Sequence, residues 1–468
     1  MNALIAFIDR NRQLVKILLI CGVLIFAGLL GLVTSKTNPV YILVLSLAPI
    51  GLVGVGFILF RFEIMPVIIM IAAAFVPLSL PTGTGSRLVD SLILSTLFVG
   101  LWVVRILTRD KKLTFFHTPV NFPLISFMVV VVLSIGWSTI FRDPLLFVWD
   151  SFPFVQAVSA LTFIVLPGVY LLVINFMPDE KQIRIIISLV LIAGAVSAIG
   201  NYIGINVPVN SQGLFAMWVI SFSLGLVYFD QKLNKFIKIL LVLLAVAWLY
   251  WGVVINVSWL AGWLPGVGAA LLLSFLRSKK WTMVLGAIVI VILVFYNRQY
   301  LVSVFQQELN ESGISRLSAW AQNWQITKQH LLLGTGPAGY AVYYMNYFPT
   351  DAMATHSNFI DLISQMGVIG SLFFLWFFIV HMWRGYKLSL WFAHKRTFIE
   401  GVVAASFAGS VCCFIMMGFG DWQLPFAYTQ TIEGFDYVVY NWIFMALTEV
   451  VYRLYVKSGR LQTEPASK

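Results

Sequence analysis

The sequence has 468 residues, of which 60% are hydrophobic and only 10% are charged, and its mean hydropathy is +0.92. Soluble domains carry about 25% charged residues, so this composition excludes the soluble enzyme classes. One membrane-spanning helix needs about 20 apolar residues, which limits this chain to about 14 spans. We therefore expect an all-α, polytopic membrane protein with about 12–14 transmembrane helices.

Apolar runs of about 16 residues or more mark the candidate spans. They cover 14–33, 40–60, 64–80, 88–107, 122–140, 158–176, 183–204, 212–229, 236–256, 258–276, 281–297, 357–383, 398–419 and 437–456. The first run follows basic residues and has no small-residue cleavage pattern, which is typical of a retained signal anchor. The runs 236–256 and 258–276 are joined by almost nothing, so a broken or re-entrant pair is one interpretation.

The charge distribution predicts an orientation. With the N-terminus in the cytoplasm and the sides alternating, 24 of the 30 Lys and Arg residues fall on the cytoplasmic side, as the positive-inside rule requires. The formal charge of +11 is thus explained by membrane topology, and we expect no nucleic-acid partner. Both termini are predicted to be cytoplasmic. Six cations remain on the other face: Lys36, Arg87, Arg142, Arg298, Arg316 and Lys328.

One long connection, residues 298–355, lies on that extracytoplasmic face. It divides the chain into a bundle of about 11 spans (1–297), the loop itself, and about three spans with a short tail (356–468). Within the loop, Ser315–Leu331 predicts a short amphipathic helix with Arg316, Trp320 and Trp324 on one face. A second, weaker candidate for an interfacial segment is 141–157. Long loops in compact proteins are usually functional or disordered, and this one is rich in aromatic residues.

The loop ends in Thr355-His356-Ser357-Asn358. Ser357 or Asn358 is expected to cap the following helix, with His356 at the outer membrane boundary. A neutral imidazole there can act as a general base; the alternative is an interfacial histidine that only caps the helix. Asn358, Asp361 and Gln365 follow as a polar stripe, which either serves function or ties this helix to its neighbours.

The outer arginines are candidates for binding a diphosphate, because guanidinium donates paired hydrogen bonds to phosphate oxygens. Arg316 is the strongest, with Arg142 and Arg87 as further candidates, whereas Arg298 fits an ordinary surface residue. The aromatic residues of the loop either stack on sugars or follow the usual enrichment of Trp and Tyr at membrane interfaces. The candidates for glycan or acceptor binding are Trp320, Trp324, Tyr340 and Tyr344, with Asp421 in the loop 420–436.

The remaining motifs argue against nucleotide and metal sites. Gly334–Gly339 formally matches GxGxxG, but it lacks the strand–turn–helix context of a dinucleotide site. We interpret it as a tight turn whose N–H groups could also hold an anion. The three cysteines fall in apolar runs without metal-ligand spacing, and HExxH is absent. We expect no metal and no cofactor.

The order of these elements resembles the O-antigen ligase/O-antigen polymerase family of C-type membrane glycosyltransferases. The matching elements are Arg316 with Trp320 and Trp324, Leu333-Gly334-Thr335-Gly336, His356-Ser357-Asn358, and Gly367-Val368-Ile369-Gly370. They span roughly residues 312–375. Members commonly carry Ser-Arg-Gly ahead of the long loop, whereas this chain has Ser258-Trp259 followed by Leu260-Ala261-Gly262. Arg142, Arg87 or Arg298 would have to take the place of that arginine.

The resemblance implies an undecaprenyl diphosphate-linked glycan as donor and a saccharide or lipid-linked saccharide as acceptor. The reaction would occur at the outer face of a bacterial inner membrane. His356 would accept the proton of the acceptor hydroxyl and arginines would stabilise the departing diphosphate, with inversion and without a metal. A rival from another class is a lipid-linked oligosaccharide flippase or other secondary transporter, for which repeat symmetry would be expected.

Overall fold

The computed structural model describes residues 62–76, 79–81, 87–107, 115–256, 259–291, 302–303, 314–349, 355–420, 422–425 and 434–457. The chain divides into two units, residues 1–65 and 66–468. The predicted spans 14–33 and 40–60 and the signal anchor lie outside the described residues.

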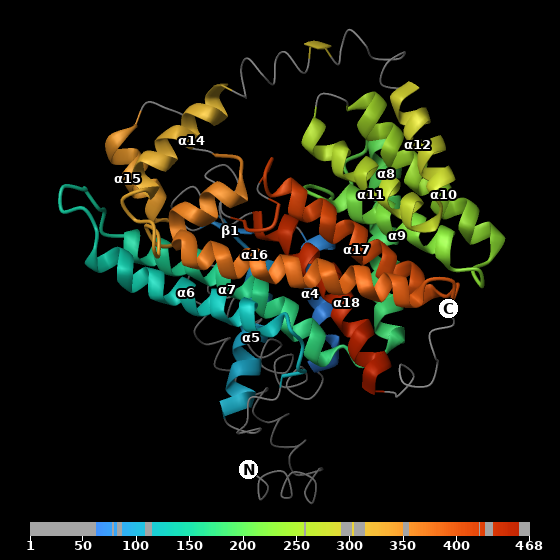
Figure 1. Cartoon of the computed structure of the whole chain (residues 1–468), viewed down its shortest axis with the longest axis horizontal. Helices are drawn as coiled ribbons and strands as arrows, with labels where there is room; N and C mark the ends of the chain where they lie inside the picture. The colour runs from blue at the N-terminus through green and yellow to red at the C-terminus, as the bar shows by residue number, and fades with distance from the viewer. Residues whose placement is uncertain are drawn as a thin grey trace, which may run out of the picture. The chain divides into compact units, whose positions relative to one another are not determined.

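The second unit is built almost entirely of helices (Figure 1). Its long helices are α4 (Met65–Phe75), α5 (Asp90–Arg105), α6 (Asn121–Ile140), α7 (Phe152–Phe176), α8 (Glu180–Ile203), α9 (Phe215–Phe229), α10 (Lys235–Tyr250), α11 (Leu260–Arg277), α12 (Lys279–Val291), α16 (Asn358–Phe392), α17 (Phe398–Met416) and α18 (Phe435–Lys457). Its shorter elements are the π-helical turn η3 (Trp251–Ile255), α14 (Ile314–Thr327) and α15 (Gly339–Tyr347), and η1 (Phe62–Ile64) belongs to the first unit.

These helices confirm the predicted fold class, an all-α polytopic membrane protein. Twelve of the fourteen predicted spans coincide with a described helix. Seven of the described helices are long and apolar enough to cross a membrane, and three shorter apolar helices lie at 62–75, 215–229 and 282–291. The pair 236–256 and 258–276 forms two separate helices, α10 and α11, joined through η3.

Hydrogen bonds between connections define the two ends of the bundle. At one end, the Gln231 N–H donates to the Arg396 carbonyl at 3.2 Å, and the Arg453 guanidinium donates to the carbonyls of Asn175 and Met177 where α7 ends. A cation at a helix C-terminus is favourable because it satisfies the last carbonyls. At the other end, the Asn210 N–H donates to the Ala74 carbonyl at 2.9 Å. We call the first the basic end and the second the loop end; which side of the membrane each faces stays a prediction.

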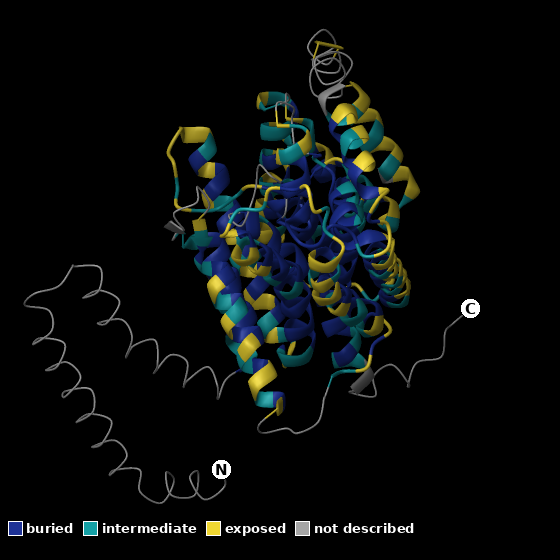
Figure 2. Cartoon of the chain, turned by 90° about the vertical axis from the view of Figure 1, so that its left-hand side faces the viewer, coloured by how far each residue is buried: buried dark blue, intermediate teal, exposed yellow. Residues whose placement is uncertain are grey.

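The core lies among α7, α9, α17 and α18, whose large side chains are buried, and Figure 2 shows the buried residues gathered in the interior of the bundle. Helices α9 and α17 approach closely at Gly225 and Gly401, where a Cβ added to either would meet the other's carbonyl oxygen at 2.7–2.8 Å. Small residues permit such approach between membrane helices, where tight packing replaces the hydrophobic effect. The C-terminal helices therefore pack among helices of the 1–297 segment, and the predicted three-part division stays a proposal.

Two local features differ from the prediction. A short antiparallel hairpin, β1 (Ser79–Pro81) and β2 (Arg87–Val89), joins α4 to α5 and pairs Leu80 with Leu88. The segment 141–151 contains turns and irregular chain and no helix, and α7 already begins at Phe152, whereas its place at the interface stays a prediction. Pro153 in the first turn of α7 suits that start, because its missing N–H would be unbonded there anyway.

Candidate active site

The sequence-predicted histidine lies where the long loop enters α16. His356 has a φ of +48°, and it is one of four described non-glycine residues with positive φ. A side chain in this region costs about 1–2 kcal/mol, so neighbouring contacts must hold the turn in place. Such strain is often concentrated at functional positions.

Contacts on both sides hold the His356 turn. The Thr355 carbonyl accepts a hydrogen bond from Trp320 Nε1 at 2.8 Å, and the Thr355 hydroxyl donates to Asp361 Oδ1 at 2.6 Å. After the histidine, the Asn358 N–H donates to the Met417 carbonyl at 2.8 Å. Loop, α16 and the end of α17 thus fix the residue between them.

Helix α14 places Trp320 beside this turn. Arg316, Trp320 and Trp324 recur every fourth residue, so they share one side of the helix. Trp320 bonds directly to the residue before His356, and Arg316 lies one helical turn earlier, about 6 Å along the axis. Trp324 is 55% exposed. Figure 1 shows α14 and α15 together beside the first half of α16.

The polar stripe of α16 is buried, and each member has a partner. Asn358 donates from Nδ2 to the Leu424 carbonyl at 3.2 Å and accepts from the Gln423 N–H at 3.1 Å. Asp361 accepts from Thr355, as above, and Gln365 accepts from the Ala338 N–H at 2.9 Å. These bonds favour the interpretation that the stripe ties α16 to its neighbours. Ser357 occupies the N-cap position, but its side chain makes no capping bond.

The glycine-rich turn docks on a break in α16. Gly367 has φ +66° and ψ −172°, which interrupts the helix. The N–H groups of Thr335 and Gly336 donate to the carbonyls of Ser364 and Gln365 at 2.8 and 2.9 Å, and Gly334 donates to His330 at 2.8 Å. The tight-turn prediction agrees with this geometry. The anion-cradle alternative does not, because these N–H groups are already bonded within the protein.

The 141–151 segment docks on α15 through polar contacts that the sequence reasoning missed. The Tyr347 hydroxyl donates to Asp143 Oδ2, and the Asp143 N–H donates to the Tyr343 hydroxyl at 3.2 Å. The bond from Tyr347 lowers the pKa of Asp143, and the same bond raises the pKa of Tyr347 to about 12. Asn346 exchanges two 3.0 Å bonds with the backbone of Phe147. The i, i+4 spacing of the two tyrosines was the available signal.

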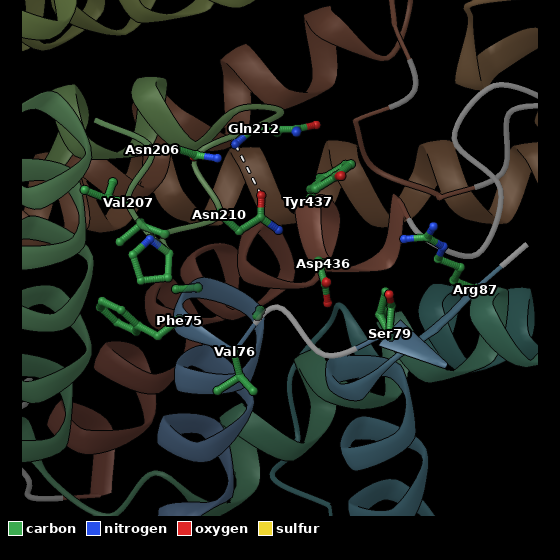
Figure 3. A pocket seen from close by; sticks show the side chains of 15 residues that line it. Phe75, Val76, Ser79, Arg87, Asn206, Val207, Asn210, Gln212, Asp436 and Tyr437 are labelled. Atoms are coloured by element: carbon green, nitrogen blue, oxygen red, sulfur yellow. Dashed lines mark hydrogen bonds between the residues drawn. The ribbon is translucent and has the colours of Figure 1, made fainter. Parts of the chain in front are cut away.

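The remaining predicted arginines lie in separate surroundings. The Arg142 guanidinium lies over the ring of Phe152, 5.1 Å from its centroid. Arg87 lines a cavity of about 540 Å³ at the loop end. Figure 3 shows it with Asp436 and Tyr437 of α18 and with Asn206, Asn210 and Gln212 of the α8–α9 connection. Asp436 also accepts a hydrogen bond from the Ser91 hydroxyl.

Some of the predicted glycan-binding residues are buried and others are exposed. Tyr340 and Tyr344 are only 3% and 2% exposed and belong to an apolar cluster with Phe152 and Ile326. Burial raises the pKa of Tyr340, and the nearby Asp361 carboxylate adds to the shift. These positions suit packing of α15 onto its neighbours, so the exposed Trp324 is the better candidate for a sugar contact. Asp421 lies outside the described residues.

A second cavity, of about 290 Å³, occupies the place where the arginine of the family motif is expected. Its lining includes Trp251, Trp259, Asn201, Asn256 and Gln212, and it shares Gln212 with the Arg87 cavity. The Trp259 ring lies against Gly262, where an added Cβ would meet the ring at 2.1 Å. Trp259 is 42% exposed. The sequence reasoning noted Trp259 only as a departure and missed this aromatic cavity.

The fold and these loop-end features together define a multi-pass membrane protein with a histidine-containing loop structure packed on the start of a broken helix. Residues 239–375 match the family model described as O-Antigen ligase. This segment runs from α10 into α16 and covers less than a third of the chain, and over it the chain is similar to that family. No curated protein matches the chain closely enough to add a relative.

Proposed function

We propose that the protein transfers a glycan from an undecaprenyl diphosphate donor to an acceptor hydroxyl at the outer face of a bacterial inner membrane. The family match supports the ligase or polymerase type of activity, and the acceptor decides between the two. Donor, sidedness and the roles of individual residues are part of the proposal.

The proposed step balances as a displacement. The acceptor oxygen attacks the anomeric carbon while its proton passes to the neutral imidazole of His356. The bond from that carbon to the diphosphate oxygen breaks, and attack from the opposite side inverts the centre. The departing diphosphate takes the electron pair, and Arg316 stabilises its negative charge through charge-assisted hydrogen bonds.

The observation that carries the proposal is the held turn at His356. His356 has a positive φ, and hydrogen bonds from Trp320, to Asp361 and to the end of α17 fix the residues on either side of it. A histidine that only capped the helix would not need this arrangement. Catalysis does benefit from it, because a base must be presented in one orientation.

The same features speak against a transporter. Alternating-access transporters place their sites at the bilayer midplane between repeated, paired discontinuous helices. Here the helix break at Gly367 binds the turn 331–336 of the loop, and the candidate residues gather at the loop end.

Reconstitution tests the proposal. The purified full chain is placed in vesicles with a polyprenyl diphosphate-linked glycan and candidate acceptors, and new glycosidic bonds are measured beside glycan translocation. We expect bond formation that falls at least about 100-fold in Arg316→Ala, while Lys328→Ala, an exposed cation in the turn after α14, keeps wild-type activity. Translocation without bond formation would instead identify a transporter.

A further inference from the structure

A groove between α16 and α18 lies near the basic end, far from the candidate active site. Its volume is about 670 Å³, and its lining includes Ile379, Trp383, Lys387, Leu388, Thr448 and Tyr452. The break at Gly367 lies between His356 and the groove, and from Gly370 to Lys387 the unbroken part of α16 runs about 25 Å at 1.5 Å per residue. The groove is therefore separate from the proposed glycan site.

One side of α16 here alternates aromatic and cationic residues. Trp383, Lys387 and Trp391 recur every fourth residue and so form one stripe on α16, and Lys395 follows in the connection after the helix. Each lysine lies over the preceding indole: Nζ is 4.9 Å from the ring centroid in the first pair and 3.5 Å in the second. Trp383 is 56% exposed. Tryptophan and lysine in this pattern are typical of the level at which lipid headgroups meet hydrocarbon.

The net charge of the groove comes from Lys387. Its other cation, Arg384, forms a two-bond ion pair with the fully buried Glu449, at 2.5 and 2.9 Å. Those two charges cancel. The groove then presents one positive charge at its margin, above walls that include Ile379 and Leu388.

A polar group in the wall supplies an independent indication of a ligand. Thr448 is 1% exposed, and its hydroxyl has no hydrogen-bond partner among the described residues. Buried hydroxyl groups without partners cost free energy and are uncommon in folded proteins. Thr448 lines the groove, so a rotation of its side chain would let the hydroxyl donate to a ligand oxygen there.

From these observations we propose that the α16/α18 groove binds one anionic phospholipid. The acyl chains lie along Ile379 and Leu388, the phosphate lies beside Lys387, and an ester oxygen accepts from the Thr448 hydroxyl. A soluble anion would gain nothing from the apolar walls, and a zwitterionic lipid would gain little from the uncompensated lysine. Basic pockets between membrane helices near the cytoplasmic surface recognise anionic headgroups in this way.

Native mass spectrometry of the purified full chain tests the proposal, with phosphatidylglycerol and phosphatidylcholine titrated separately. We expect phosphatidylglycerol to bind at one preferred site. Lys387→Ala should weaken it about fivefold, the equivalent of about 1 kcal/mol for one lysine near a lipid phosphate. Lys387→Arg should retain it. Ile379→Trp, at an exposed wall position, should lose the preferred site by filling the groove.

The matched control is Lys235→Ala, an exposed lysine on α10 at the same end of the bundle, which should leave the affinity unchanged. Thermal unfolding of each variant checks that the fold is intact. Equal binding of phosphatidylcholine would overturn the proposal, and so would equal effects of the two alanine variants. Displacement of phosphatidylglycerol by glycerol 3-phosphate would also overturn it, by indicating a soluble-anion site.

Discussion

Replacing Gly367 by alanine tests how the loop is held on α16. An added Cβ would lie 2.3 Å from the Leu332 carbonyl oxygen, and φ is +66°. The left-handed conformation costs about 1–2 kcal/mol with a side chain. The clash also threatens the bonds from Val368 and Ile369 to the carbonyls of Leu331 and Leu332, at 2.8 and 3.3 Å, worth about 0.5–1.5 kcal/mol each. The sum is about 2–5 kcal/mol.

Hydrogen exchange of the peptide that covers 328–339 measures this cost, because the N–H groups of Thr335 and Gly336 are bonded across the break. A loss of about 2 kcal/mol in local stability speeds exchange about 30-fold. Gly136→Ala is the control: a Cβ there meets nothing within 4 Å in the interior of α6, and we expect slight stabilisation of that helix. Exchange in Gly367→Ala within threefold of wild type would refute the reasoning.

Three further predictions concern the loop. Trp320→Phe removes the donor to the Thr355 carbonyl and should lower transfer about 5- to 30-fold through loss of one positioning bond, with the protein still folded. Burial lowers the pKa of His330 in the folded loop. As the pH falls below about 6.5, the unfolded loop therefore binds a proton on this histidine that the folded loop does not bind. Proteolysis of the loop should increase from pH 7.5 to 5.5, and His330→Gln should reduce this pH dependence. Trp324→Ala should raise the KM for the glycan without changing thermal stability, whereas Tyr340→Ala should destabilise the loop by about 3–5 kcal/mol.

Each of these has a contrary outcome. Unchanged glycan transfer in Trp320→Phe would show that the bond from Trp320 to the Thr355 carbonyl does not position His356. A loop that becomes more resistant to protease at pH 5.5 would reverse the sign derived for His330. A Tyr340→Ala variant of normal stability with a raised KM would return the buried tyrosine to the list of sugar-binding residues.

Local patterns in the sequence were sufficient to predict the loop helix and the twelve spans that coincide with described helices. Hydropathy over about 20 residues and the spacing of Arg316, Trp320 and Trp324 depend only on neighbouring residues, and α14 follows from them closely. The boundaries shifted where tertiary contacts intervene. The start of α7 at Phe152, for example, accompanies the docking of 141–151 on α15.

Long-range contacts could not be predicted in the same way. Gly367 was visible as part of a Gly-x-x-Gly pattern, but its positive φ depends on carbonyls of Leu331 and Leu332, some 35 residues away. The cap at Ser357 was expected from residue type, yet the hydroxyl faces the Met417 carbonyl of another helix. The Trp259 cavity likewise needs the α8–α9 connection, which no local pattern brings beside η3.

The central claim is that His356 accepts the proton of the acceptor hydroxyl. Its most direct test is the rate of glycosidic bond formation by His356→Ala beside His117→Ala, an exposed histidine at the basic end. We predict a loss of at least about 100-fold for the first, within the range of general-base catalysis, and wild-type activity for the second, with both variants folded. Wild-type activity in His356→Ala would contradict the account.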